Sequence, residues 1–212
     1  MHFRLLCPVP NIGAVIGKQG AVIKEVRDQT LAKIRIEDLV PGADERVITI
    51  APGEKGDSEL ALHQLLAIIW EASDQEGGAD VTARLLVSDV GCLLGKSGNV
   101  STQIRSDSGA NILIISSSKG RPGQIPLCAF PTESVVQVQA GQAEVRKAMQ
   151  LIIAKLKEND AKLEAKGIKP TGPAAGAAFG MMDPMQQQMG GARWAPAICL
   201  RFCFSSHVLC AD

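Results

Sequence analysis

The chain has 212 residues, a hydrophobic fraction of 46% and no formal net charge at pH 7. This length suits one large domain or two small ones, and zero net charge excludes a global basic field, so nucleic acid would have to bind through local lysines and arginines. Six cysteines without paired spacing favour reduced thiols in an intracellular protein. The apolar run in residues 1–8 is too short for a signal sequence or a membrane span, so we expect no membrane association.

The first part of the chain predicts the order strand, helix, helix, strand, strand, helix. Strands are expected where apolar residues alternate, and helices where they recur at i, i+3, i+4 and i+7. The expected elements are a strand at 3–7, a short helix at 12–16 capped by Asn11, a helix at 21–29, a strand at 33–37, a loop at 38–45, a strand at 46–50 and an amphipathic helix over 62–69.

The second part repeats this order. Its expected elements are a strand at 82–87, a short helix at 90–94, a helix at 99–108, a strand at 111–115, a long polar loop at 116–133, a strand at 135–139 and a helix with an apolar stripe from Val145 to Leu156. A short linker around residues 74–80 predicts two neighbouring units with limited freedom. From about residue 167 the sequence is rich in Ala, Gly, Met and Gln, which predicts a disordered tail.

A glycine-lysine loop lies between the first two helices of each unit, at residues 17–20 and again at 95–98. Glycines have no side chain, so a sugar–phosphate backbone can approach the loop closely. The N-terminus of the following helix favours the negative charge of a phosphate, and Lys18 and Lys96 add a cation to each loop. A groove beside the loop, between the helix pair and the next strand, would accept unpaired bases on aliphatic side chains such as Ile16.

A GxxG loop between two helices of a βααββα unit resembles the type I KH domain, whose loop clamps four nucleotides. Residues 4–6, 16–20 and 45–50 are similar to poly(C)-binding-type KH proteins, and the letters FRLLCP with the long second loop are most similar to the plant multi-KH branch. The resemblance implies an α+β fold of two KH domains, each a three-stranded antiparallel sheet packed on three helices. The expected boundaries are 1–73, a linker at 74–80, a second domain with an extended C-terminal helix at 81–166, and a disordered tail at 167–212.

The resemblance, with the groove described above, gives two sets of candidate RNA-binding residues. An isoleucine of such a groove is equally compatible with a role in the core. The two helix arginines, Arg27 and Arg105, are also compatible with solvated surface charges. The first set is Gly13, Ala14, Ile16, Gly17, Lys18, Gln19, Gly20, Ile23, Arg27, Arg35, Ile36 and Arg46. The second set is Gly91, Cys92, Leu94, Gly95, Lys96, Ser97, Gly98, Arg105 and Ile114.

The second unit departs from the family pattern at three positions. Ser101 stands where the first unit has Ile23, Leu113 replaces Arg35, and Ser134 replaces Arg46. The second unit therefore keeps the phosphate-binding loop and loses part of the base-reading set. We expect its RNA binding to be weaker or less selective.

The resemblance implies binding of single-stranded RNA, with a pyrimidine- or C-rich preference, in RNA processing or post-transcriptional regulation. We expect a nuclear protein, with the cytoplasm as a second location, that assembles with other mRNP proteins. Two alternatives stay open: single-stranded DNA binding in transcription, and a protein-interaction scaffold in which the stripe from Val145 to Leu156 or the tail docks a partner. The three histidines lie in unrelated segments, so no enzyme activity and no cofactor are expected.

Two other patterns resemble known motifs, a P-loop and a zinc site, but their spacing does not match. Three residues separate Gly91 from Gly95-Lys96-Ser97, whereas a P-loop requires four, so nucleotide hydrolysis is disfavoured. The spacing of the cysteines and histidine in residues 199–210 does not match known zinc fingers, so no metal site is expected. We hypothesise that residues 194–212 are an alternative or read-through terminus.

Overall fold

The computed structural model describes residues 1–73, 80–116, 125–165 and 167. The first domain contains β1 (Phe3–Pro8), α1 (Ile12–Ile16), α2 (Ala21–Thr30), β2 (Lys33–Ile36), β3 (Glu45–Ala51) and α3 (Ser58–Ala72). The predicted order βααββα is confirmed for this domain. Helix α3 begins earlier than its apolar stripe, because the Asp57 carboxylate accepts hydrogen bonds from the backbone N–H groups of Glu59 and Leu60 at 2.9 and 3.1 Å.

The second domain repeats the order with β4 (Val81–Val87), α4 (Gly91–Leu94), α5 (Asn99–Ser108), β5 (Asn111–Ile115), β6 (Ser134–Ala140) and α6 (Gln142–Ala165). The apolar stripe of α6 is buried in the hydrophobic core of the protein; Val145, Met149 and Ile153 are all fully covered. The alternative that this stripe docks a partner protein is therefore wrong. Nearly all of the expected linker and tail lies outside the described residues.

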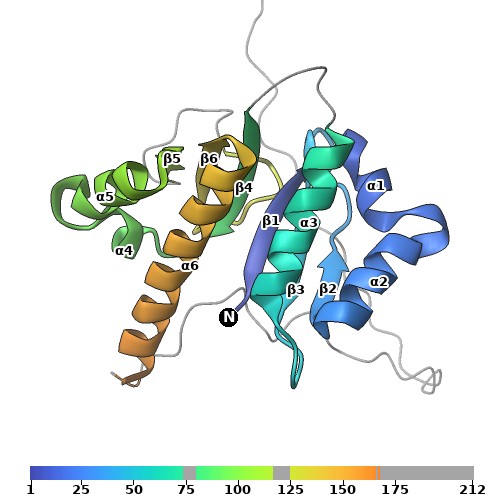
Figure 1. The fold of residues 1–212 in the computed structure, drawn as a ribbon, viewed down its shortest axis with the longest axis horizontal. Helices are drawn as coiled ribbons and strands as arrows, with labels where there is room; N and C mark the ends of the chain where they lie inside the picture. Colours follow the sequence, from blue (N-terminus) through green and yellow to red (C-terminus); the bar gives the residue numbers. More distant parts are fainter. Residues whose placement is uncertain (74–79, 117–124, 166, 168–212) are drawn as a thin grey trace, which may run out of the picture. The chain divides into compact units, whose positions relative to one another are not determined.

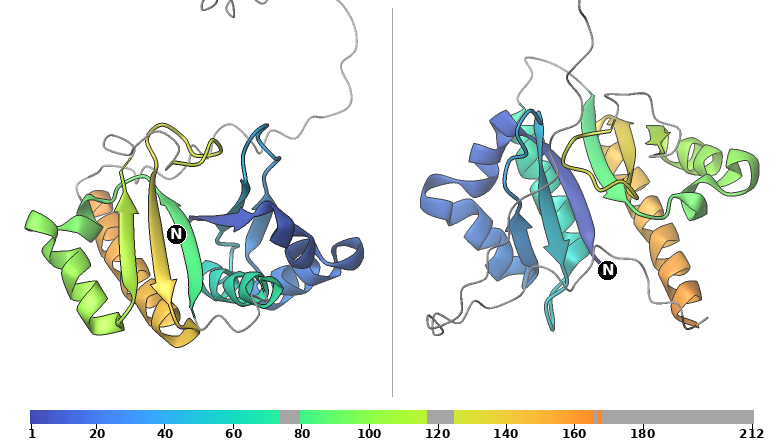
Figure 2. Two further views of the ribbon diagram at one scale, coloured as in Figure 1. Left: turned by 90° about the horizontal axis from the view of Figure 1, so that it is seen from above. Right: turned by 180° about the vertical axis from the view of Figure 1, so that it is seen from behind.

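The two domains share one six-stranded sheet with the strand order β2-β3-β1-β4-β6-β5, and every neighbouring pair is antiparallel. Strands β1 and β4 join the domains, with Arg4 opposite Leu86 and Leu5 opposite Leu85. Helices of both domains cover one face of the sheet, as the views in Figures 1 and 2 show. The sequence predicted neighbouring domains but gave no sign of a shared sheet.

Side-chain alternation in the strands divides the sheet into two faces. On the helix side, Leu5, Ile48 and Leu85 belong to a core that continues through both domains and includes the inner faces of α3 and α6. The opposite face carries a smaller apolar cluster at the junction, formed by Leu6, Val47, Leu86 and Val135. The junction is therefore packed on both faces of the sheet.

A pseudo-two-fold axis relates the two domains. Leu5 lies opposite Ile48 in the first domain, and Leu85 lies opposite Val136 in the second, so the two leucines occupy equivalent positions. The same two leucines pair with each other across the β1–β4 junction. Because equivalent residues face each other on antiparallel strands, the axis passes between them.

Side-chain contacts across the junction follow the same symmetry. Arg84 pairs with Glu45 at 2.5 Å, and its equivalent Arg4 approaches Glu133 at 2.9 Å. A second crossed set joins α3 to α6: Lys157 pairs with Glu59, and the Arg146 guanidinium lies 5.8 Å from the centre of the Trp70 ring. The Trp70 indole N–H also donates to the Thr82 carbonyl at 3.0 Å. These contacts fix the relative orientation of the two domains.

The expectation that Asn11 caps the short helix α1 is wrong. Its side chain makes no capping hydrogen bond. Instead the Asn11 amide donates to the Ser73 hydroxyl at 2.6 Å and to the Ile69 carbonyl at 3.4 Å, both at the C-terminal end of α3. The Asn11 amide therefore links the start of α1 to the end of α3 and leaves the first turn of α1 without a side-chain cap.

Candidate nucleic-acid interface

The loop between α1 and α2 has a backbone that requires glycine. Gly17 adopts φ 72° and ψ 177°, a region open essentially only to glycine, and Gln19 and Gly20 follow in the left-handed region at φ 53° and 79°. The loop between α4 and α5 has the same shape, with φ 67° at Gly95 and 56° at Ser97. The sequence repeat is therefore also a repeat of backbone geometry.

The first glycine of each loop also leaves no room for a side chain. A Cβ at Gly17 would lie 2.4 Å from Val22 Cγ2, and one at Gly95 would lie 2.5 Å from Val100 Cγ2. These valines sit in the first turn of the next helix, so the glycine lets the loop fold back tightly onto that helix. The close contact holds the loop at the N-terminus of α2 or α5.

Substitution of Gly17 by alanine is expected to destabilise the first domain by about 3 kcal/mol, from backbone strain and the clash with Val22. The matched control is Gly13→Ala, because Gly13 is helical, exposed and has open space around its Cα; alanine there should leave stability unchanged or raise it by up to about 1 kcal/mol. Urea unfolding of both variants measures the difference. Equal stabilities would contradict this account of the loop.

The loops present the groups that a phosphate needs. The side chains of Lys18 and Gln19, and of Lys96 and Ser97, are all exposed. The N-termini of α2 and α5 lie at the loops, where the helix dipole is positive. The first N–H group of each helix, at Ala21 and Asn99, donates to the carbonyl of Lys18 or Lys96. A phosphate at either loop would meet the positive end of the helix dipole together with one lysine.

Arg27 lies in the last turn of α2 and is neither a free surface charge nor a fully available RNA ligand. Its Nε and Nη2 atoms both donate to the Ile34 carbonyl of β2, at 3.1 and 2.6 Å. Arg105 makes the equivalent pair of hydrogen bonds to the Ile112 carbonyl of β5. Each arginine therefore ties the second helix of its domain to the outermost strand, across the floor of the expected groove.

Sequence reasoning did not find this tie, although a signal was present: each arginine precedes its isoleucine by seven residues in both units. A guanidinium has five N–H donors, so two hydrogen bonds to one carbonyl leave capacity for a ligand. Arg27 and Arg105 stay in the candidate set with a second, structural role.

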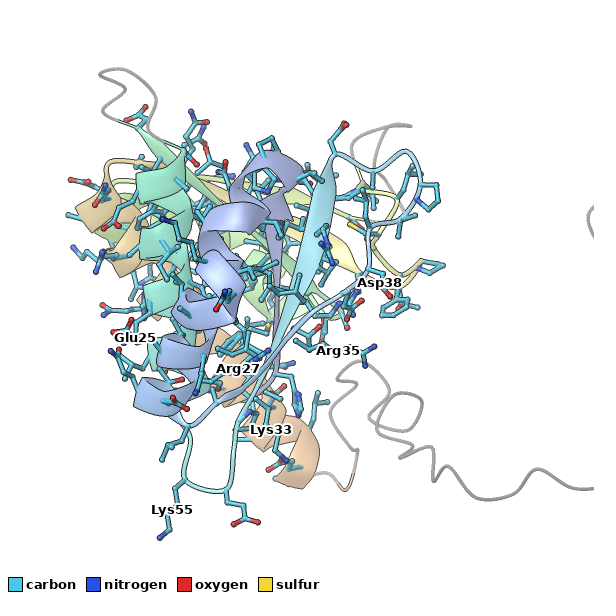
Figure 3. The ribbon with its side chains drawn as sticks, turned by 90° about the vertical axis from the view of Figure 1, so that its right-hand side faces the viewer. Glu25, Arg27, Lys33, Arg35, Asp38 and Lys55 are labelled. Carbon is cyan, nitrogen blue, oxygen red and sulfur yellow. The ribbon has the colours of Figure 1, made fainter. Side chains whose placement is uncertain are left out.

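Strand β2 and the start of β3 supply the other two candidate RNA-binding arginines of the first domain. Arg46 donates from Nε to the Glu37 carbonyl at 2.8 Å, which fixes its stem at the end of β2. Arg35 is exposed on β2, and Figure 3 shows it on the strand beside the helix that carries Arg27. The nearby Glu37 carboxylate accepts hydrogen bonds from Arg4 and Thr49, at 3.1 and 2.7 Å, and the Arg4 guanidinium offsets its negative charge.

The aliphatic candidates differ in what they can contact. Ile23 is only 5% exposed and belongs to the core, so it supports the groove from beneath. Ile16 and Ile36 are half-buried at the edge of that core and keep surface for a base. In the second domain Ile114 is half-buried, while Leu94 is 38% exposed. The small residues Gly13, Ala14 and Gly91 are exposed on their short helices.

The second groove has a different chemical character. Leu113 is 48% exposed where the first domain has Arg35, and Ser134 is buried at the position of Arg46. Ser101, at the position of Ile23, is also buried, and its hydroxyl donates to the Gly98 carbonyl at 2.9 Å. The second domain therefore keeps its loop geometry with fewer cations along the strands.

One exposed acidic side chain, Asp89, lies just before α4 in the second domain. The Asp89 carboxylate accepts from the Gly91 N–H at 2.9 Å and from the Asn159 amide at 3.2 Å. Burial, and to a lesser extent the negative charge of Asp89, raise the pKa of Cys92 to about 11, so this thiol stays protonated at neutral pH. A phosphate chain entering this groove would meet both the Lys96 cation and this negative charge.

The described residues contain no cluster of histidine, cysteine or acidic side chains that could hold a metal ion. None of their helices is long and apolar enough to cross a membrane. The cysteines and histidine of residues 199–210 lie outside the described residues.

Comparison with known proteins matches both domains to one family. Residues 2–67 and 83–154 each match the model described as the KH domain. The RNA-binding KH domain-containing protein RCF3 of Arabidopsis thaliana is 31% identical over 187 residues, which cover 74% of this chain and 28% of that protein. KH domain-containing protein HEN4 of the same plant is 35% identical over 172 residues, covering 69% of this chain and 19% of that protein.

A fungal relative extends the comparison. PAB1-binding protein 2 of Saccharomyces cerevisiae is 26% identical over 168 residues, which cover 70% of this chain and 40% of that protein. The chain therefore spans less than half the length of each of these three relatives.

Proposed function

Because the chain belongs to the KH domain family, as a tandem protein of its plant multi-KH branch, we propose that it binds single-stranded RNA through the two glycine loops and their grooves. The chemistry is non-covalent: the loop holds the phosphates, and the groove between α2 and β2 reads the bases. The observation that carries this proposal is the repeated loop geometry. Gly17 and Gly95 share a backbone that only glycine adopts, next to an exposed lysine and a helix N-terminus.

The first domain is the proposed source of selectivity. Arg35 and Arg46 stand at the strands of its groove, and Arg46 is held in place by the Glu37 carbonyl. We propose a preference for pyrimidine-rich and especially C-rich RNA, as the resemblance to poly(C)-binding-type KH proteins implies. The two guanidinium groups supply N–H donors for the carbonyl and ring-nitrogen acceptors of the bases. The second domain, with Leu113 and Ser134 in their place, adds affinity with little selectivity.

The wider role follows from the family and its relatives. We propose that the chain acts in RNA processing or post-transcriptional regulation, in the nucleus and also in the cytoplasm, together with other mRNP proteins. The name of the yeast relative, which describes it as binding PAB1, supports partners of that class. No catalytic step is part of this proposal, because the proposed site acts by binding alone.

Titration with short oligonucleotides tests the proposal. The full chain should bind a C-rich RNA more tightly than a purine-rich RNA of equal length, and the double variant Arg35→Leu/Arg46→Ser should lose about 1–3 kcal/mol of that discrimination. This variant gives the first groove the residues of the second. The matched control is Lys24→Ser, because Lys24 is an exposed cation on α2 outside the candidate set.

Two other outcomes decide between the alternatives. Equal affinity for the DNA oligonucleotide of the same sequence would favour the single-stranded DNA alternative, because only RNA carries the 2′-hydroxyl. Failure to bind any of the oligonucleotides, with the fold intact by circular dichroism, would refute the proposed function and favour a scaffold.

A further inference from the structure

We infer that the two grooves run in opposite directions on one fixed body, so that the preferred RNA carries two binding tracts separated by a spacer that loops out between them. This inference rests on the proposed function and specifies its substrate. It is carried by the order of the strands, the contacts of the junction and the pseudo-two-fold axis.

The direction of each groove follows from the sheet. The first groove lies along β2 and the second along β5, at the two edges of the sheet. Five antiparallel pairings connect these strands, and an odd number of reversals leaves them antiparallel. Within each domain the same local elements set the polarity of the bound strand, with phosphates at the glycine loop and bases along the strand. Two bound RNA tracts must therefore run antiparallel.

The separation follows from the same order. Five inter-strand gaps of about 4.8 Å place β2 and β5 on the order of 24 Å apart. One continuous strand that leaves the first groove must cross this width and reverse its direction before it enters the second. Two tracts that directly follow each other cannot do so, whereas a spacer of sufficient length makes the turn.

The junction prevents the domains from turning to relieve this constraint. Leu5 pairs with Leu85 in the sheet, and ion pairs cross the junction in both directions, from Arg84 to Glu45 and from Arg4 to Glu133. Arg4 and Glu133 are 4% and 2% exposed, so their contact is shielded from solvent. Buried apolar side chains on both faces of the sheet at the junction hold the two domains in this orientation.

The symmetry has a second consequence. A two-fold axis places the exit of the first groove and the entrance of the second at the same end of the molecule. It also places the entrance of the first groove and the exit of the second together, at the opposite end. The spacer therefore has the same length whichever tract comes first. The two outer ends of a bound two-tract RNA leave the protein at one common edge.

The test uses the full chain and three RNAs made from the same C-rich tract: one tract alone, two tracts directly joined, and two tracts joined by a long unstructured spacer. The long-spacer RNA should bind at least about tenfold more tightly than the single tract, because the second contact is intramolecular. The directly joined RNA should show no such gain in a one-to-one complex. Dyes on the two ends of the long-spacer RNA should show increased energy transfer on binding, through the common edge.

One variant tests the contribution of the second groove, and another tests the rigidity of the junction. Lys96→Asp/Ser97→Asp should remove the tenfold gain and the increase in energy transfer, and should lower the affinity for the single tract by less than about tenfold. Glu45→Arg, which places two arginines together at the junction, should free the domains and let the directly joined RNA gain affinity, and Glu45→Arg/Arg84→Glu should restore the requirement for a spacer. The gain must be measured with the fold confirmed by circular dichroism.

The outcomes separate this inference from the proposed function. A directly joined RNA that binds the unaltered protein one-to-one with the full gain, or energy transfer that falls on binding, would overturn the antiparallel arrangement and leave RNA binding intact. No binding of the single tract would instead overturn the proposed function.

Discussion

Substitution of Lys18 and Gln19 by aspartate is expected to weaken binding of a single C-rich tract roughly 100-fold, which corresponds to about 3 kcal/mol. The change removes the cation of the first loop and places two negative charges where the phosphates sit. The loss comes from the loop itself, because both side chains are exposed and neither belongs to the core. Fluorescence anisotropy with a labelled RNA measures the change in Kd.

The fold should survive this substitution. Gln19 adopts a left-handed backbone at φ 53°, and aspartate is among the residues that tolerate this conformation best. The matched control is Lys96→Asp/Ser97→Asp in the second loop, where Ser97 has the equivalent φ of 56°. We expect this control to lower the affinity for a single tract by less than about tenfold, because selectivity is assigned to the first groove. Equal losses in the two variants would contradict the assignment.

Substitution of Arg4 by alanine is expected to destabilise the protein by about 3–5 kcal/mol, because it breaks a buried ion pair by removing one partner. Arg4 is 4% exposed and lies 3.1 Å from Glu37, 2.9 Å from Glu133 and 4.4 Å from the centre of the Phe130 ring. Its loss leaves the Glu133 carboxylate, 2% exposed, without the nearby guanidinium. Chemical denaturation followed by tryptophan fluorescence measures the change, since Trp70 lies at the same junction.

The symmetry of the molecule supplies the control for this variant. Arg84 occupies the equivalent position in the second domain, but it is 24% exposed and its partner Glu45 is 12% exposed. Arg84→Ala should therefore cost no more than about 1–2 kcal/mol, because solvent screens the pair. Equal costs at the two positions would show that burial does not decide the strength of these contacts.

The effect of Arg4→Ala should depend on pH. Burial raises the pKa of Glu133 above its usual value of 4.5, while the Phe130 N–H and the Arg4 charge lower it in part. A carboxyl whose pKa is raised by folding favours the folded state at low pH, and this stability is lost as the pH rises through the folded-state pKa. Without Arg4 this pKa rises further. The deficit of the variant relative to the unaltered protein should therefore shrink as the pH falls from 7 toward 4.5; a constant deficit would contradict this role of Glu133.

The order of the elements could be read from the sequence because each signal for it is local. Alternation marks the strands, a 3.6-residue period marks α3 and α6, and Pro and Gly mark the loops between them. The glycine loops could be read for the same reason: Gly17 and Gly95 are required by the backbone of four consecutive residues. Their recurrence in matching surroundings established the two-domain repeat, which the structure confirms.

Burial and hydrogen-bond partners could not be read in the same way. The local pattern left open whether Ile23 lies in the core, and it did not show that Asn11 binds the end of α3. The seven-residue spacing from Arg27 to Ile34 recurs in both units, but by itself it did not identify a hydrogen bond. A carbonyl is present at every residue and leaves no mark in the side-chain pattern. Which carbonyl a guanidinium meets is decided by how the helix packs beside the strand.

The sequence by itself determined the two domains, their element order and their glycine loops, because periodicity and glycine geometry act over a few neighbouring residues. Only the tertiary structure decided that β1 and β4 join the domains into one sheet. Edge strands pair through backbone groups that every residue carries, so the choice of partner depends on which edges meet in space. The crossed pairs of Arg4 with Glu133 and Arg84 with Glu45 then follow from that register. The antiparallel direction of the two grooves is a consequence of this long-range pairing.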